Sequence, residues 1–169
     1  MTDVGPGNGQ GAAPAELPAP VIRVLAQYVK DSSFENPGAP QSLRAGLPQP
    51  QIDLALDVSA GPVPDAAGVF ETALRITASA NRDGAPVFVA ELVYAALMQL
   101  ENVYDNEVEP ILLIEGPRLI FPFARMVLAD MTREGGFPPL MLDPVDFTDL
   151  YRRNLASRQG GEAPATAQG

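Results

Sequence analysis

The chain has 169 residues and a mass of 17.9 kDa, the usual size of one domain, and its 46% hydrophobic content is sufficient for one sizeable core. Twenty-one acidic residues against 11 basic ones give a net charge of −10, which argues against binding to nucleic acid or to anionic lipid surfaces. The absence of His and Cys excludes imidazole bases, thiol nucleophiles, disulfides and nearly all transition-metal sites.

Two segments of low complexity bound the predicted domain. Residues 1–20 are rich in Gly, Pro and Ala and have almost no large apolar side chain, so burial cannot offset the entropy of ordering them. Residues 157–169 turn to Ser, Gln, Gly, Ala and Pro, and the same argument applies to them. We therefore expect disordered tails on either side of one folded domain at residues 21–156, with neither a standard signal peptide nor a membrane span.

The first two-thirds of the domain predicts β-strands. Apolar and polar residues alternate with period two, which places them on opposite faces of a pleated strand. A proline-punctuated loop at residues 36–50 is too long for a tight hairpin, whereas Asp83-Gly84 has the residue types of a hairpin turn. Antiparallel strands with one wet face have this pattern. The predicted strands are residues 21–30, which are the most weakly patterned, 52–58, 69–80 and 86–97.

The remaining third predicts two helices. Leu119, Phe123, Val127 and Met131 recur every fourth residue, with Ile120, Ala124 and Leu128 beside them, and form a broad apolar face. Pro122 costs no intrahelical hydrogen bond in a first turn, so we expect this helix to start near Leu119 and to end at residues 135–136, which are both Gly.

The second helix is expected to begin at residues 143–146. Asp143 is the predicted N-cap, Pro144 is the first helical residue, and Asp146 complements the positive end of the helix dipole. Asp143, Asp146 and Asp149 are spaced by three, which is compatible with a calcium or magnesium site, but capping and a solvated helix face account for them better.

Apolar residues in the loops provide the only other unusual feature. Together they predict a surface that another chain completes, either a subunit or a client. No catalytic, metal-binding or cofactor-binding group is predicted. These loop residues are Phe34, Leu43, Leu47, Phe137, Leu140 and Met141.

Several motifs resemble one known family, the SecB protein-export chaperones. Residues 30–37, KDSSFENP, resemble the family's first-strand signature. Residues 119–125, LIFPFAR, with Met131 downstream, and then residues 136–140 and 144–147, resemble its helical half. The resemblance covers residues 21–156 in collinear order.

The resemblance implies an α+β fold: a four-stranded antiparallel sheet with two main helices on one face, assembled as a dimer of dimers. It also implies a non-enzymatic, cofactor-free, cytoplasmic chaperone that holds unfolded secretory preproteins without ATP and delivers them to the SecA motor. Two departures stand out. Leu47 and Pro48 occupy the crossover loop where the family commonly has a tryptophan, and residues 162–169 contain one carboxylate where enteric members have an acidic tail.

Two sets of site residues follow from the resemblance. The implied SecA-binding set is Asp31, Glu35, Val89 and Glu91, and Glu91 alternates with Phe88 and Leu92, so it should face away from the helices. The implied client-binding set comes from the second strand, the crossover loop and the last helix. Its members are Leu43, Leu47, Ile52, Leu54, Leu56, Leu150, Tyr151 and Leu155.

Two other functions stay open on the sequence. A dedicated adaptor, or a chaperone of the toxin–antitoxin type, could use the same fold for one partner. An enzyme that relies on loop carboxylates is the third alternative, because paired carboxylates cannot be recognised without geometry.

Overall fold

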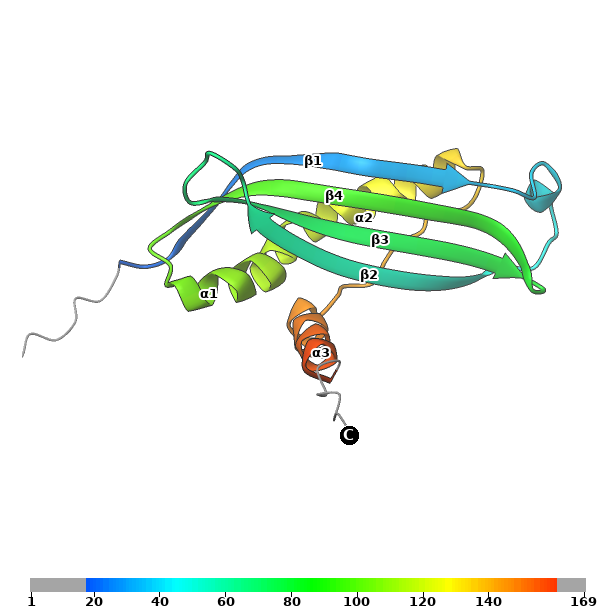
Figure 1. Ribbon diagram of the computed structural model, residues 1–169. Coiled ribbons are helices and arrows are strands. Elements are labelled where there is room, and N and C mark those ends of the chain that lie inside the picture. Colours follow the sequence, from blue (N-terminus) through cyan, green and yellow to red (C-terminus); the bar gives the residue numbers. More distant parts are fainter. Residues whose placement is uncertain (1–17, 161–169) are drawn as a thin grey trace, which may run out of the picture.

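The computed structural model describes residues 18–160, in which four long antiparallel strands form one sheet and helices cover one of its faces (Figure 1). This confirms the predicted α+β class and the four-stranded antiparallel sheet. The spatial order is β1-β4-β3-β2, so β1 and β2 are the two edges. The strands are β1 (Val21–Glu35), β2 (Gln51–Pro62), β3 (Val69–Arg82) and β4 (Ala85–Glu101).

The helices follow the sheet in the chain. They are α1 (Asp105–Pro110), the π-helical turn η2 (Ile111–Glu115), α2 (Gly116–Glu134) and α3 (Phe147–Gly160), and a short 3-10 turn, η1 (Gln41–Leu43), lies in the crossover loop. None of them is both long and apolar enough to cross a membrane.

The described strands and helices run from Val21 to Gly160. Residues 1–17 and 161–169, which make up most of the two predicted tails, lie outside the described part of the chain. Helix α3 continues to Gly160, four residues beyond the expected limit at residue 156.

The predicted strands lie inside longer observed ones. Strands β3 and β4 are joined by Asp83 and Gly84, both with positive φ (51° and 77°), as the Asp-Gly pair predicted. Strand β1 continues to Glu35, well beyond the predicted end at residue 30. Its register against β4 shifts between Val24 and Ala26 and again between Val29 and Asp31. Each shift interrupts the period of two, which explains the weak pattern of this strand.

The prediction that the long helix starts near Leu119 is wrong. Helical backbone runs without a break from Asp105 through α1, η2 and α2 to Glu134. Pro110 and Pro122 both lie inside helices. Each proline removes one backbone donor, and the wider π-helical turn after Pro110 accommodates this irregularity. In the sequence alone, a proline inside a helix therefore looks the same as a proline in the first turn of a helix.

The predicted N-cap of the last helix is also wrong. Helix α3 begins at Phe147, and the Oδ1 atom of Asp146 accepts hydrogen bonds from the backbone N–H groups of Thr148 (2.9 Å) and Asp149 (3.1 Å). Phe147 is 1% exposed and packs edge-on against Phe121. Because burial of this ring sets where the helix starts, the cap falls on the residue just before it.

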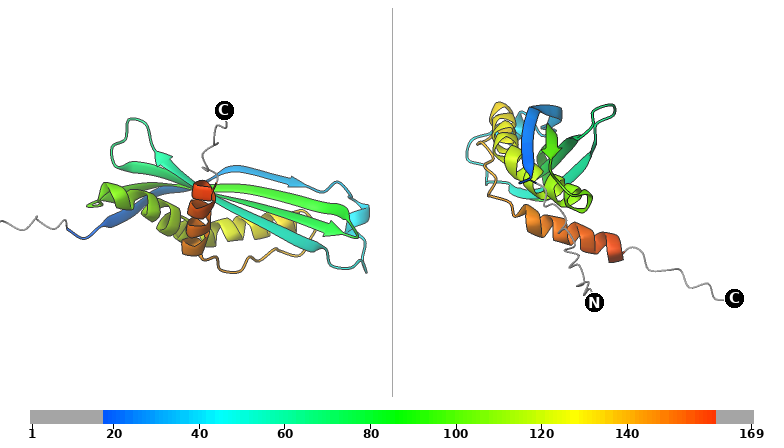
Figure 2. Two further views of the ribbon diagram at one scale, coloured as in Figure 1. Left: turned by 60° about the horizontal axis from the view of Figure 1, so that its bottom comes forward. Right: turned by 90° about the vertical axis from the view of Figure 1, so that its left-hand side faces the viewer.

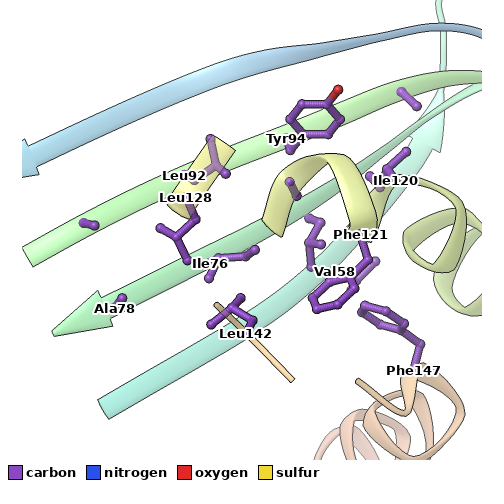
Figure 3. Close-up of a cluster of buried hydrophobic side chains, with 14 of the residues drawn as sticks. Val58, Ile76, Ala78, Leu92, Tyr94, Ile120, Phe121, Leu128, Leu142 and Phe147 are labelled. Atoms are coloured by element: carbon purple, nitrogen blue, oxygen red, sulfur yellow. The ribbon is translucent and has the colours of Figure 1, made fainter. Parts of the chain in front are cut away.

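The core lies between the inner face of the sheet and α2 (Figure 3). The buried row of α2 is Ile120, Ala124 and Leu128, which is one part of the predicted broad apolar face. Leu119 and Phe123 of the same predicted face are 45% and 41% exposed. Helix α2 packs on β4 and β3, the two central strands, and touches β1 less. Its apolar face is therefore only partly covered within one subunit.

A glycine at the start of α2 allows this helix to approach the sheet closely. A Cβ atom at Gly116 would lie 2.9 Å from both Cγ2 and Oγ1 of Thr72. Thr72 is fully buried in β3, and its hydroxyl donates to the carbonyl oxygen of Leu112 at 3.2 Å. A larger residue at position 116 would displace the helix from the sheet.

A buried threonine attaches the segment between α2 and α3 to the core. The Thr132 hydroxyl donates to the carbonyl oxygen of Ala129 (3.0 Å) and accepts a hydrogen bond from the N–H of Leu140 (2.9 Å). Thr132 is 0% exposed, so water cannot replace either bond.

We expect Thr132→Val to lower the free energy of unfolding by about 1–3 kcal/mol, because the N–H of Leu140 loses its partner at nearly constant side-chain volume. Urea unfolding followed by circular dichroism measures this. Thr77→Val, on the outer face of β3, is the matched control and should change the value by less than about 0.5 kcal/mol. Equal effects of the two substitutions would contradict the assigned role of Thr132.

Candidate functional site

The first candidate site lies on the outer face of the sheet, away from the helices. In the pairing of β1 with β4, Asp31 is opposite Val93, Ser33 is opposite Glu91, and Glu35 is opposite Val89. Directly opposed residues share a face, so three carboxylates and Val89 lie together on two adjacent strands. We call Asp31, Glu35, Val89 and Glu91 the acidic patch.

The carboxylates of the acidic patch carry uncompensated charge. Asp31 and Glu35 are exposed, while Val89 and Glu91 are half-buried. Within residues 18–160, none of the three carboxylates forms a salt bridge. The patch can therefore attract a basic surface, with Val89 as an apolar contact beside Glu91.

A polar cluster on the same face was not predicted from the sequence. The Glu71 carboxylate accepts hydrogen bonds from the Tyr28 hydroxyl and the Lys30 ammonium group, both at 2.5 Å. The bond to Glu71 raises the pKa of Tyr28 to about 12, and the bonds from Lys30 and Tyr28 lower the pKa of Glu71. The cluster joins β1 to β3 across β4, directly before the strand segment that carries Asp31. The sequence did not reveal this cluster because of the bulge in β1. Simple alternation along the strand would place Tyr28 and Lys30 on the opposite face from Asp31.

The second candidate site is the inner face of β2, on which α2 packs less than on the central strands β3 and β4. Ile52 and Leu56 are half-buried at the margin of the core, whereas Leu54 is 46% exposed. Helix α3 packs mainly on η2 and is directed away from the sheet (Figure 2). An apolar strip of the inner face of β2 around Leu54 is therefore open, whereas Val58 farther along the strand is buried in the core.

At one end of this strip lies a hollow of about 260 Å³, the loop hollow. Leu43 and Leu47 of the crossover loop line it together with Ile52, and Phe88 and Phe137 also contribute. The centroids of those two rings are 4.8 Å apart, and the ring of Phe34 stacks on Phe88 at 5.5 Å. The aromatic surface comes from these side chains, although the loop itself has no tryptophan.

At the middle of the strip, α3 forms a narrow cleft against Val58 of β2 and Leu113 of η2. Leu150, Tyr151 and Leu155 line it from the helix. The predicted client-binding residues therefore lie in three groups along one strand: three in the loop hollow, three in this cleft, and Leu54 and Leu56 between them. We call this arrangement the β2 groove.

Sequence reasoning missed several groove residues. Phe88 and Val58 fall in predicted strands without a site role, and the sequence singles out no role for Leu113. Phe137 was noted as an apolar loop residue, which was the available signal. Only the tertiary fold brings these side chains to the same groove.

Comparisons with known proteins show which family the chain resembles. Residues 15–158 match the family described as preprotein translocase subunit SecB. The protein-export protein SecB of Maricaulis maris is 58% identical over 155 residues, which cover 92% of this chain and 89% of that protein. The protein of the same name from Hyphomonas neptunium is 51% identical, with 90% and 93% covered.

A solved structure is also similar in fold. A SecB-like chaperone of Mycobacterium tuberculosis, solved with a peptide from an antitoxin, superimposes with a TM-score of 0.61 at 17% sequence identity. The match covers 73% of this chain and 90% of that one.

Proposed function

The chain belongs to the SecB family of preprotein translocase subunits, and we propose that it holds unfolded secretory preproteins in the cytoplasm and delivers them to the SecA motor. Holding needs neither ATP nor a cofactor, and no step is catalytic. The β2 groove carries this proposal, because it offers unfolded chains an open apolar strip that ends in a hollow.

The groove can select unfolded clients without reading a sequence. Burying one client Leu or Phe contributes roughly 1.5–3 kcal/mol at best. Several such contacts on one chain reinforce one another through effective concentration, so a long unfolded client is held far more tightly than a short peptide. A folded protein exposes too few apolar segments to make them.

Similarity to export proteins favours this function over a dedicated adaptor of the toxin–antitoxin type. The relatives named protein-export protein share about half or more of their residues with this chain. The neighbour that carries an antitoxin peptide shares 17%, a level that supports the fold alone.

We expect Leu54→Gln with Tyr151→Gln to weaken client holding, because both side chains lie in the groove and polar replacements remove apolar contact area. Suppression of the aggregation of a diluted, unfolded precursor measures holding. Tyr104→Gln, a substitution at a 52% exposed tyrosine outside the groove, is the control and should leave holding unchanged. Full suppression by the double variant would show that clients bind elsewhere.

Delivery is proposed to use the acidic patch. Its carboxylates lie on the flat outer face, so a basic surface of SecA could dock there while a client occupies the inner side. Exposed ion pairs typically contribute under about 1 kcal/mol each, so the interaction should be shared among them and sensitive to salt.

Asp31→Lys with Glu91→Lys should abolish SecA association, because it replaces attraction by repulsion at the centre of the patch. Surface plasmon resonance at low and high salt measures the association. Glu107→Lys with Asp143→Lys makes the same change in net charge elsewhere and should retain binding. If SecA binds the patch variant as well as wild type, or if salt has no effect on wild-type binding, docking occurs elsewhere.

Assembly as a dimer of dimers is proposed from two further apolar surfaces. Leu119, Phe123 and Met126 of α2 are 45%, 41% and 58% exposed. On the edge strand β1, Val24, Leu25 and Val29 are 41%, 52% and 44% exposed. Surfaces of this kind are covered in closed, symmetric oligomers, and two of them on one subunit allow two different interfaces.

Light scattering should therefore give the mass of a tetramer for the full chain at micromolar concentration. Phe123→Glu with Met126→Glu should lower this mass, because two buried carboxylates would destabilise the interface through α2. Leu54→Glu changes an equally exposed leucine in the groove and should leave the mass unchanged. A stable wild-type monomer would contradict the proposed assembly.

A further inference from the structure

The two ends of the β2 groove carry charges of opposite sign. The loop hollow is lined by Arg44 and Arg82, with no carboxylate among its lining residues. The other end opens into a hollow of about 530 Å³ lined by Asp57, Asp105 and Glu109, with Arg158 as its one cation. We call these the basic end and the acidic end.

The cations of the basic end are available to a bound chain. Neither Arg44 nor Arg82 forms a salt bridge in the described part of the protein. Arg82 is positioned by the loop, because its Nε donates to the carbonyl oxygen of Pro48 at 2.7 Å. Asp53 and Asp83 lie on the other side of Arg82, around a separate hollow.

At the acidic end, one of the three carboxylates is already compensated. Glu109 Oε1 lies 3.1 Å from a terminal nitrogen of Arg158. Asp57 lies opposite Arg75 on the outer face of the sheet, so the excess of negative charge at this end comes from Asp105, which forms no salt bridge within residues 18–160. Apolar contact is offered there too, by Val108 and Leu112.

The separation of the two ends sets the length of client that can reach both. Ile52 lines the basic end and Ala60 the acidic end. Eight residues of extended strand span roughly 26 Å. This is longer than the screening length of about 8 Å at physiological salt, so each end acts on its own part of the client. Leu54, Leu56 and Val58 lie between them.

We propose that the groove prefers client segments with an acidic residue at one end, a basic residue at the other and apolar residues over the roughly eight positions between them. The inference deepens the proposed holding function and rests on it. In this proposal, the basic end and the acidic end of the groove determine which client segments bind best, and the apolar strip between them contributes to binding every client. Because the rim charges are exposed, the preference should be modest, about three- to tenfold at low salt, and should diminish as salt increases.

Four labelled peptides with the same apolar centre test this. The first peptide has Glu at one end and Lys at the other. The other three have Glu at both ends, Lys at both ends, or Gln at both ends, with roughly eight positions between the two end residues in every peptide. Fluorescence anisotropy with the full chain at low salt should rank the Glu and Lys peptide first.

Charge-reversal variants identify the ends. Arg44→Glu, at an exposed loop residue, should transfer the preference to the Lys and Lys peptide. Asp105→Lys should transfer it to the Glu and Glu peptide. Arg23→Glu makes the same charge change as Arg44→Glu on the outer face, at the far end of β1, and should preserve the wild-type ranking. Circular dichroism and light scattering establish that each variant is folded and assembled.

The outcomes separate the two proposals. Equal affinities for all four peptides, or a ranking that Arg44→Glu and Asp105→Lys leave unchanged, would overturn the charge preference while the proposed holding function stands. Failure of every peptide to bind, together with failure to suppress precursor aggregation, would overturn both.

Discussion

The width of the sheet, compared with the width of a single helix, determines what this molecule leaves uncovered. Four strands spaced about 4.8 Å apart place the outer two roughly 14 Å from each other, whereas one helix with its side chains is about 10–12 Å across. Helix α2 lies on the central strands β3 and β4, held close by the contact of Gly116 with Thr72. The inner faces of both edge strands therefore remain partly open.

The two open strips differ in their surroundings, and the proposed functions follow that difference. On the β2 side, the crossover loop lines a hollow that includes Ile52 and α3 lines a cleft that includes Val58, with the exposed Leu54 between them. On the β1 side, α2 packs less closely than on the central strands, and the exposed Val29 and the exposed flank of α2 are the surfaces proposed to contact another subunit. The outer face carries a small apolar cluster of Ala73, Val93 and Ala95, and it presents the acidic patch. The surfaces proposed for clients, subunits and a basic partner thus lie on different parts of one small domain.

The parts of the fold that depend on local chemistry were predictable, while those that depend on tertiary contacts were not. Period-two alternation correctly placed Glu91 on the opposite face of its strand from Phe88 and Leu92. The Asp83-Gly84 pair correctly predicted the hairpin. The start of the long helix was missed because its prolines lie inside continuous helical backbone. The groove residues were predicted in part from family resemblance. The hollow beneath them requires Phe88 and Phe137, which are distant in sequence and meet only in the folded chain.

The central claim is that clients bind the uncovered inner strip of β2 and leave the outer face available. Methyl NMR of the full assembly, with and without an unfolded precursor, tests it most directly. The account predicts that the client shifts or broadens the methyl signals of Leu43, Leu47 and Leu54, while those of Val89 on the outer face stay in place. Perturbation of Val89 with unchanged signals from Leu54 would contradict it.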